Sequence, residues 1–554
     1  MMTGWRGAVV AVLVATAPWP ASGRDLVDLQ ADRQVATITL AGGRRVELTD
    51  LAPPIGAWYL LRIDARSPRT QAWHLENRAP HRQALVLDAA RAGLVLRAEG
   101  SPDCVVRLSP PDALAAAAAA RVPFAPLCDG RLAVRNALPG HRTSLEATTQ
   151  FLRDRVWGGE RLVSFVKHTF YQDAFALRDT ARASAAPPAD KPWPDAPTRP
   201  RLVPAASTQS VAPAGLALDI GAGQERLRPG DWWPVQGRHG VFVTAFTPRD
   251  LPAVGSPPPA AAEADALDYF VAFDLARFDV GFELGTDQPR LGWSDRASGA
   301  MRDALLPGPD GIDSAAPLVR TGAVDPALAR RIVATFTGGF KREHGAFAHG
   351  PLSTQNHASH YGFVEQGVVF STLQPGLSTL FATADGQVDL RTWPRQDAPA
   401  PATLRFARQN GVPLVESTAG AAPRIGAWVR QWGAGNWSGS ADEQERTLRA
   451  GACLLEDGGR RFLVYGWFST ATPLTMARAF LALGCRDAMH LDMNALEHTY
   501  LALYVREGGR VGVEHLVEGM SVLDRSDGQT LAPRFLGVPD DRDFFYVVDK
   551  APGP

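Results

Sequence analysis

Three polar residues near the end of the chain, His490, Asp492 and Asn494, have the spacing expected of a site on a strand. Apolar residues stand between them, and the side chains of a strand alternate between its two faces, so we expect the three polar groups to share one face. His490 and Asn494 are equally well explained as hydrogen-bonded structural groups. Asp492 is the strongest candidate for chemistry, because an ionised carboxylate is costly to bury without a partner or a task.

The residues around this run offer further acid, base and anion-binding groups. Glu497 and His498 follow it closely and are candidate acid/base groups. Arg449 stands at the entrance of a predicted strand, and its planar guanidinium suits a phosphate or a carboxylate. An ordinary surface salt bridge would explain Arg449 equally well.

A second motif, Thr337-Gly338-Gly339, directly follows a predicted strand. Paired glycines let the backbone approach a ligand closely and let amide N–H groups point at an anion. A plain tight turn is the alternative, but Lys341 and Glu343 follow at once and add a positive and an acidic group. We therefore expect this loop to contribute to the same site as Asp492.

Metal and nucleotide chemistry are not expected. Four histidines lie between residues 344 and 360, but glycine and proline interrupt the stretch, and it contains neither His-Glu-x-x-His nor Cys-x-x-Cys. A metal-dependent hydrolase is thus the weaker alternative. Gly221-Ala222-Gly223 lacks the third glycine of a dinucleotide fingerprint, and the chain has no Gly-x-Ser-x-Gly elbow. We expect no metal and no cofactor.

The elements that must position Asp492 form a strand–helix–strand unit. Thr472 is a suitable N-cap for a helix over Pro473–Leu483, and Gly484 is a suitable C-cap. Strands are predicted on either side, over Arg461–Phe468 and Ala488–Asn494. Such a crossover places the polar groups at the carboxyl end of its second strand, where ligands of open α/β sheets usually sit.

Composition describes an ordinary exported globular protein. The 554 residues carry a formal charge of −1 and are 45% hydrophobic, which gives no electrostatic footprint for nucleic acid or for anionic lipid. A basic residue, an apolar run and a small-residue cleavage site predict a signal peptide over 1–23. No later stretch approaches transmembrane length, so we expect no membrane association after its removal and a periplasmic or extracellular location.

Four cysteines fit an oxidising compartment. Pairing within each region, Cys104 with Cys128 and Cys453 with Cys485, is the natural expectation. The alternative for the second pair is that both are small buried hydrophobic residues.

The chain divides into four segments. After the signal peptide we expect a β-rich accessory domain (24–180), a Pro/Ala-rich linker (181–213) and a strand-rich domain with interspersed helices (214–550). The fold class is mixed α/β (α+β), with the strand–helix–strand unit in the second domain. Within that domain, Gly362–Phe370 is predicted as a single strand, and no catalytic constellation is found in 24–180.

The order of these motifs resembles the phosphodiester glycosidase family, relatives of the lysosomal enzyme that removes N-acetylglucosamine to uncover mannose 6-phosphate. That family has Asn-Gly-Gly-Phe after a strand, an Arg-Thr-Ala-x-Gly strand with an Asp-Gly hairpin, a helix, and a strand ending in Leu-Asp. The similar stretches here are Thr337-Gly338-Gly339-Phe340, Arg449-Ala450-Gly451-Ala452, Asp457-Gly458, Pro473–Leu483 and Leu491-Asp492. Coverage runs from about 216 to 548. Thr337 replaces the family Asn. Asp492-Met493-Asn494 replaces Asp-Gly-Gly, and this second replacement resembles a bacterial subfamily.

The resemblance implies hydrolysis of a sugar-1-phosphodiester, with a carbohydrate or sugar phosphate as the partner. Asp492 would act as nucleophile or general base, and the further acid/base candidates are Glu497, His498 and Glu343. The candidates for holding phosphate or sugar are Thr337, Gly338, Gly339, Lys341, Arg449 and Asn494. The alternative is a glycan-binding envelope protein that keeps the fold without the reaction.

Overall fold

The computed structural model describes residues 26–64, 70–155 and most of 212–550, with its longest internal gaps in the last range at 292–311, 341–361 and 430–444. The predicted signal peptide and nearly all of the predicted linker lie outside the described residues. The described chain is rich in strands, which pair antiparallel in its sheets, with few helices. The mixed, strand-rich fold class is therefore confirmed.

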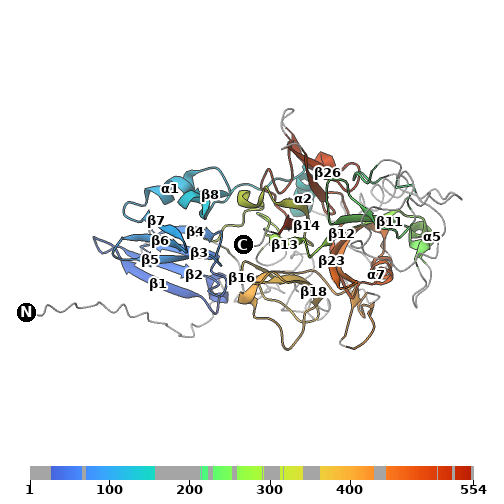
Figure 1. Ribbon diagram of the computed structural model, residues 1–554, viewed down its shortest axis with the longest axis horizontal. Helices are drawn as coiled ribbons and strands as arrows, with labels where there is room; N and C mark the ends of the chain where they lie inside the picture. The colour runs from blue at the N-terminus through green and yellow to red at the C-terminus, as the bar shows by residue number, and fades with distance from the viewer. Residues whose placement is uncertain are drawn as a thin grey trace, which may run out of the picture.

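Two sheets sharing one apolar core build the N-terminal part of the molecule, at the left of Figure 1. The six-stranded sheet has the order β1 (Gln34–Thr39), β2 (Arg45–Asp50), β3 (Trp58–Ile63), β4 (Gln71–Asn77), β9 (Leu132–Arg135), β8 (Phe124–Leu127). The three-stranded sheet has the order β5 (Gln83–Asp88), β6 (Gly93–Ala98), β7 (Ser101–Arg107). Helix α1 (Asp112–Ala119) buries Leu114 and Ala117 against them.

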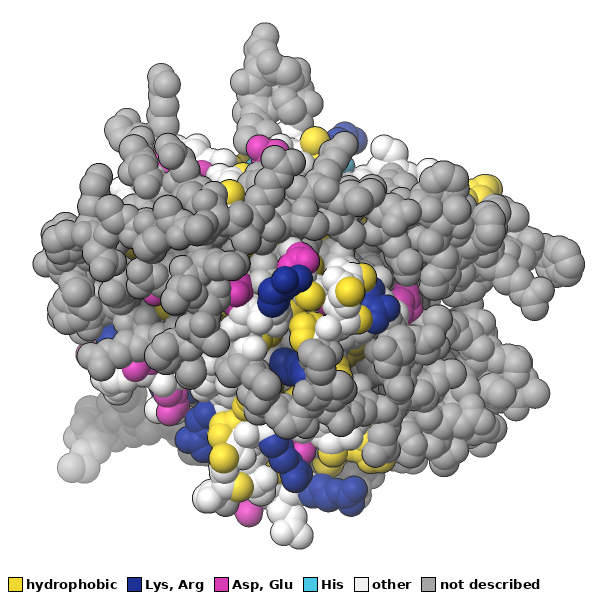
Figure 2. Space-filling view, turned by 90° about the vertical axis from the view of Figure 1, so that its right-hand side faces the viewer, with side chains coloured by type: hydrophobic (Ala, Val, Ile, Leu, Met, Phe, Trp, Pro, Cys, Tyr) yellow, Lys and Arg dark blue, Asp and Glu magenta, His cyan; other side chains and the backbone are white. Residues whose placement is uncertain are grey.

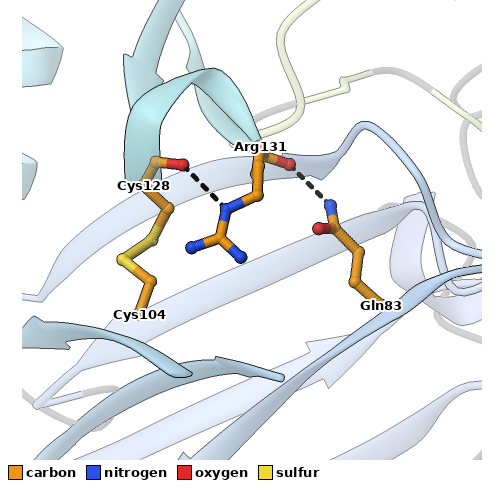
Figure 3. The surroundings of a disulfide bond; sticks show 4 residues. All are labelled: Gln83, Cys104, Cys128 and Arg131. Carbon is orange, nitrogen blue, oxygen red and sulfur yellow. Dashed lines mark hydrogen bonds between the residues drawn. A yellow bond between two sulfur atoms is a disulfide. The ribbon is translucent and has the colours of Figure 1, made fainter. Parts of the chain in front are cut away.

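A disulfide joins these two sheets. Cys104 on β7 is bonded to Cys128, which begins the short 3-10 helix η2 (Cys128–Gly130) between β8 and β9. Arg131 Nε donates to the Cys128 carbonyl (3.2 Å), and Gln83 Nε2 donates to the Arg131 carbonyl (2.8 Å), as Figure 3 shows. The predicted pairing is confirmed, and it links the three-stranded sheet to a turn of the six-stranded one.

The largest sheet carries the strand–helix–strand unit. Its eight strands have the order β10 (Trp233–Pro234), β11 (Val241–Phe246), β12 (Asp268–Asp274), β23 (Arg460–Ala471), β22 (Thr447–Asp457), β24 (Asp487–Met493), β20 (Val415–Glu416), β21 (Arg424–Ile425). Helix α7 (Pro473–Ala482) connects β23 to β24. Both strands pair antiparallel with β22, so they run parallel to each other with β22 between them. The predicted crossover is confirmed, with one strand inserted.

Local chemistry explains the boundaries of this unit. The Thr472 hydroxyl accepts from the Thr475 amide at the start of α7, and Gly484 takes a left-handed φ of 85° behind it. The β22–β23 hairpin turns through Gly458 and Gly459, both at positive φ, as a two-residue hairpin requires. The Cys453–Cys485 disulfide joins β22 to the entry of β24, as predicted.

Two five-stranded sheets complete the part of the chain after residue 212. One has the order β13 (Phe278–Glu283), β29 (Phe544–Asp549), β14 (Ile332–Thr337), β25 (Leu501–Glu507), β26 (Arg510–His515). The other has the order β16 (Val368–Ser371), β15 (Phe363–Glu365), β19 (Leu404–Gln409), β17 (Ser378–Thr383), β18 (Val388–Thr392). A short ladder pairs β27 (Arg525–Ser526) with β28 (Leu531–Ala532). One face of the eight-stranded sheet shares a core with these sheets, and α7 packs in a second core with its other face.

The remaining helices are short. They are η1 (Leu26–Leu29), η5 (Pro248–Asp250), α5 (Ala261–Ala264), η7 (Pro326–Leu328), η9 (Pro401–Thr403) and η10 (Met520–Leu523). None of the described helices is long and apolar enough to cross a membrane. Figure 2 shows the end of the molecule at which α5 and β11 lie, with basic and acidic side chains next to one another at the centre of the face.

One predicted strand is wrong. The stretch Gly362–Phe370 is not a single strand but a hairpin of β15 and β16. The chain reverses at Gln366 and Gly367, which both have positive φ (50° and 78°). The apolar residues on either side of this turn hid it, because a Gln-Gly pair is a weaker turn signal than Asn-Gly or Asp-Gly.

Helix α2 (Ser144–Arg155) lies with the sheets of the later part of the chain rather than with the N-terminal sheets. Figure 1 shows it among the C-terminal strands. Just before it, the His141 amide donates to the Pro539 carbonyl (2.7 Å), and the Asp541 amide donates to the His141 carbonyl (3.2 Å). The N-terminal part of the chain thus reaches across to the segment that precedes β29.

Candidate functional site

Asp492 lies in a β-bulge at the end of β24. On the neighbouring strand, Gly451 pairs with His490 and Arg449 pairs with Met493, so three steps along β24 match two along β22. Directly paired residues share a face, which puts His490 and Met493 together and turns Asp492 away from them. The prediction that His490 and Asp492 share a face is therefore wrong, because the bulge adds one residue between them.

The face that carries His490 is the one covered by α7. A Cβ on Gly451 would come within 2.8 Å of the Phe480 ring of that helix. His490 is fully buried there, with its ring centroid 5.4 Å from that of Phe340. Burial and the nearby positive charge of Arg449 lower the pKa of His490 well below its ordinary value. A neutral, buried histidine on this face is a core residue.

Asp492 is held by an arginine from the other end of the domain. Its Oδ2 accepts from Arg542 Nη1 (2.6 Å), and its Oδ1 accepts from the Met493 amide (2.9 Å). The Asp492 side chain is 10% exposed and that of Arg542 is 5% exposed. Burial alone would lower the pKa of Arg542, but the carboxylates of Glu146 and Asp492 raise it.

Glu146, on the first turn of α2, is the second carboxylate on that guanidinium. Its Oε1 accepts from Arg542 Nε (2.6 Å), and its side chain is 6% exposed. Its Oε2 accepts from the Thr143 amide (3.1 Å), while the Thr143 hydroxyl accepts from the Glu146 amide (3.1 Å), which is a capping box. Burial would raise the pKa of Glu146, but Arg542, Arg534 and His498 lower it further than burial raises it.

Neither Glu146 nor Arg542 was expected from the sequence. The two residues are 396 positions apart, and the region of Glu146 was assigned no catalytic group. Two signals could have found them. Thr143-x-x-Glu146 is a capping-box pattern, and Asp540-Asp541-Arg542-Asp543 is a run of charges set directly before the apolar strand β29.

The structure brings the predicted residues Glu497 and His498 to this ion pair. His498 Nδ1 lies 2.6 Å from the Met493 carbonyl oxygen, and its Nε2 lies 3.8 Å from Glu146 Oε1. Glu497 is buried, and its backbone carbonyl accepts from Arg534 Nη1 (2.7 Å). Burial raises the pKa of the Glu497 carboxyl, which favours its protonated form. The site therefore combines a carboxyl group whose pKa is lowered, Glu146, with one whose pKa is raised, Glu497.

Asp541 is a further acid beside Arg542. Its Oδ2 accepts from Arg142 Nε (2.7 Å), and its Oδ1 is buried with no hydrogen-bond partner among the described residues. Burial, with the charge of Asp540, raises the pKa of Asp541 to about 7. This carboxyl changes its charge close to neutral pH.

The Gly-Gly motif packs beside the site at the end of β14. The Gly338 amide donates to the Asp543 carbonyl (2.9 Å), next in sequence to Arg542, and Thr337 Oγ1 donates to the His498 carbonyl (2.5 Å). A Cβ on Gly338 would clash with the Asp543 carboxylate, and one on Gly339 would lie 2.7 Å from Asn410 Cγ. The two glycines are thus required by close packing.

Asn410 ties this motif to β24, and sequence reasoning missed it. Its Oδ1 accepts from the Phe340 amide (3.0 Å), and its Nδ2 donates to the carbonyls of His490 (2.8 Å) and Leu491 (3.2 Å). Asn410 is fully buried. Of the backbone amides of 337–340, that of Gly339 alone has no acceptor in the described part of the chain.

Arg449 is not brought together with Asp492. It lies on the α7 face, fully buried, where it donates to the Ala471 carbonyl (2.7 Å), the Glu445 carbonyl (3.0 Å) and Met493 Sδ (3.1 Å). Burial lowers its pKa to about 10. These contacts make Arg449 a tie between β22, β23 and β24.

The remaining predicted residues fall in two groups. Asn494 lies just beyond β24 at a φ of 80°, and its Oδ1 accepts from Thr447 Oγ1 (3.1 Å). The alternation expected over Ala488–Asn494 therefore does not reach it. Lys341, Glu343 and the histidine window 344–360 lie outside the described residues.

Comparisons with known proteins add weak likenesses. No family model matches the chain, and no curated protein matches it. The zebrafish N-acetylglucosamine-1-phosphodiester alpha-N-acetylglucosaminidase catalytic domain, auto-inhibited by its pro-peptide, aligns with a TM-score of 0.27 and 9% identity over 60% of this chain and 87% of that one. An exported protein of Burkholderia pseudomallei aligns with a TM-score of 0.20 and 13% identity over 93% of this chain and 96% of that one. At these scores neither likeness assigns the chain to a family.

Proposed function

We propose that the protein is an exported hydrolase that cleaves the glycosidic bond of a sugar-1-phosphodiester in an envelope or extracellular glycan. The observation that carries the proposal is the Asp492 carboxylate, which a bulge turns out of the strand alternation and which Arg542 contacts at 2.6 Å. The two disulfides support export, because such bonds form in oxidising compartments.

A carboxylate next to a guanidinium suits this reaction. Glycoside cleavage ordinarily needs two carboxyl groups, one of which protonates the leaving oxygen. A phosphate leaving group is already a stable anion, so a positive group can replace much of that acid's work. Asp492 would act at the anomeric carbon as nucleophile or general base, and Arg542 would receive the phosphate, whose charge competes with the carboxylate for the same N–H groups.

Further roles follow from the surroundings. Glu497, whose pKa is raised by burial, would supply a proton, with His498 and Glu343 as the other candidates. The Gly339 amide and Lys341 would contact the phosphate, and Asn494 a sugar hydroxyl. Gly338 and Thr337, whose donors are engaged within the protein, would support these groups from behind, and Arg449 would act only indirectly, by holding β22, β23 and β24 together on the α7 face.

The test is turnover of a sugar-1-phosphodiester such as uridine diphosphate N-acetylglucosamine or an aryl analogue, followed by release of reducing sugar. Asp492→Asn should abolish turnover. The matched control is Asp487→Asn at the other end of β24, where the carboxylate accepts from Ser417 Oγ (2.6 Å) instead of from an arginine. Equal turnover by wild type and Asp492→Asn would refute the assignment.

A second candidate is a non-catalytic glycan-binding protein. One observation favours it: both Asp492 oxygens already accept hydrogen bonds, and the side chain is only 10% exposed. It predicts no turnover by any variant, with glycan binding equal in wild type and Asp492→Asn. Glycan-array binding measured on the same two preparations separates it from the hydrolase.

A further inference from the structure

We infer that Glu146 is a positioning residue of the active site: its carboxylate fixes Arg542 against Asp492, so the N-terminal part of the chain completes a site otherwise built by the C-terminal domain. This inference rests on the proposed function, because it takes Asp492 as the reacting carboxylate. It assigns a role in the reaction to a residue on α2, in a region that the sequence marks only as accessory.

The geometry of the guanidinium carries the inference. Arg542 uses Nη1 for Asp492 and Nε for Glu146, each at 2.6 Å. A guanidinium is planar and rigid, so two anchors on different nitrogens fix both its position and the direction of its plane. Without the Glu146 carboxylate, Arg542 would keep only one of these two contacts, the one with Asp492, and its guanidinium could rotate about it. Misplacing a group by about 1 Å can slow a reaction on the order of 100-fold.

Glu146 is itself firmly placed. The capping box with Thr143 uses Oε2, which leaves Oε1 for Arg542. The segment before the helix is pinned to the loop that carries Arg542 by the backbone bonds between His141 and residues 539 and 541, and by the ion pair from Arg142 to Asp541. Each anchor lies within five residues of Glu146, so the N-terminal segment delivers the carboxylate with little freedom.

The electrostatics agree with a permanent anion at this position. Arg542, Arg534 and His498 together lower the pKa of Glu146, so its carboxylate stays ionised throughout the neutral range. Arg542 therefore keeps its full positive charge while Asp492 reacts. A helix cap alone would not need this arrangement, because a capping box is satisfied by the Oε2 contact with Thr143.

The test compares two glutamates in equally buried ion pairs. Glu146→Gln removes the negative charge of the carboxylate that contacts Arg542. Glu76→Gln is the matched control, because Glu76 Oε2 contacts Arg135 Nη1 at 2.5 Å with side-chain exposures of 11% and 1%, far from Asp492 in the chain and in a separate charge cluster. Glu146→Gln should lower kcat by about 100-fold with a much smaller change in KM. Glu76→Gln should keep kcat, whatever its melting temperature, and Glu146→Asp should recover part of the loss.

A readout independent of turnover separates the inference from the proposed function. In protein labelled with 15N-arginine, the NMR signal of the Arg542 Nε–H group is assigned by its disappearance in Arg542→Lys. This proton should be protected from hydrogen exchange with water in wild type and should lose that protection in Glu146→Gln. Unchanged kcat and an unchanged signal in Glu146→Gln would overturn the inference. A rise in kcat would also overturn it, because it would show that α2 inhibits the site instead of completing it. If wild type turns over no phosphodiester but the signal behaves as stated, the proposed function fails and the positioning of Arg542 stands.

Discussion

Removing the guanidinium that joins the two carboxylates should destabilise the protein in a strongly pH-dependent way. In Arg542→Met, the side chains of Asp492 and Glu146 remain at 10% and 6% exposure without their shared positive partner. Buried carboxylates in that position avoid the desolvation penalty by taking up protons. The variant therefore reports directly on whether these two acids are held as ions by Arg542.

The size of the effect follows from the protonation cost. Taking reference pKa values of about 3.9 for Asp and about 4.3 for Glu, protonation at pH 7 costs about 4 kcal/mol for each group, at about 1.4 kcal/mol per pKa unit. Arg534 and His498 still face Glu146, and the Met493 amide still faces Asp492, so part of this penalty is not incurred. We expect a loss of about 4–6 kcal/mol at pH 7, in the range measured when one partner of a buried pair is removed or slightly above it.

The stability of Arg542→Met should fall as pH rises. In the variant the folded-state pKa values of both acids lie above their unfolded values, so the folded variant binds more protons and loses stability as pH rises from about 4 to 7. The penalty relative to wild type should shrink by about 1–3 kcal/mol for each pH unit below 7, depending on whether one or both acids titrate.

The assay is urea unfolding of wild type and Arg542→Met at pH 5, 6 and 7, followed by tryptophan fluorescence. Arg424→Met is the control, because its pair with Glu416 is on the surface, with a 68% exposed arginine, and should be worth less than about 1 kcal/mol at every pH. Adding Asp492→Asn and Glu146→Gln to Arg542→Met should restore most of the stability. A penalty below about 1 kcal/mol, or one that does not change with pH, would refute the ion-pair account.

Two further predictions concern neighbouring residues. Asp541, whose pKa burial raises to about 7, keeps its proton in the folded protein at pH values where the unfolded chain has lost it, so Asp541→Asn should gain stability over wild type as pH rises from 5 to 7, by up to about 1.4 kcal/mol per pH unit, and level off above 7; a difference that is constant from pH 5 to 7 in chemical unfolding would contradict the raised pKa. Gly338→Ala, whose Cβ would clash with the Asp543 carboxylate, should lose about 1–3 kcal/mol in the same experiment, while Gly512→Ala, whose Cβ would meet no atom closer than the Val505 carbonyl oxygen at 3.7 Å, should lose less than Gly338→Ala does; the reverse order would show that the motif is not closely packed.

Local signals in the sequence predicted the scaffold of the site well. The N-cap Thr472, the helix behind it and the hairpin at Gly458 and Gly459 follow from rules that act over a few residues, and all three are present. The Cys453–Cys485 pairing also followed, because both cysteines flank the same unit. The position of β22 between β23 and β24 could not be predicted, because a strand–helix–strand pattern does not reveal whether another strand lies between its two strands.

The site itself depends on contacts that no local rule reaches. A bulge of one residue moves Asp492 off the face of His490, and strict alternation cannot foresee an added residue. Arg542 contacts Asp492 from 50 positions later in the chain, and Glu146 contacts Arg542 from about 350 positions before Asp492. Their roles therefore arise only from the folded topology. Arg449 looked like an anion clamp because of its type, yet its position beside the α7 face gives its guanidinium backbone and sulfur partners.

The most direct test of the proposed function is which bond of the substrate is broken. Hydrolysis of a sugar-1-phosphodiester in water enriched in oxygen-18, with the products separated and weighed by mass spectrometry, locates the oxygen that water supplies. Attack assisted by Asp492 at the anomeric carbon predicts the label in the sugar hydroxyl and none in the phosphomonoester. Label in the phosphate would show cleavage of the phosphorus–oxygen bond and would contradict the role given to Asp492.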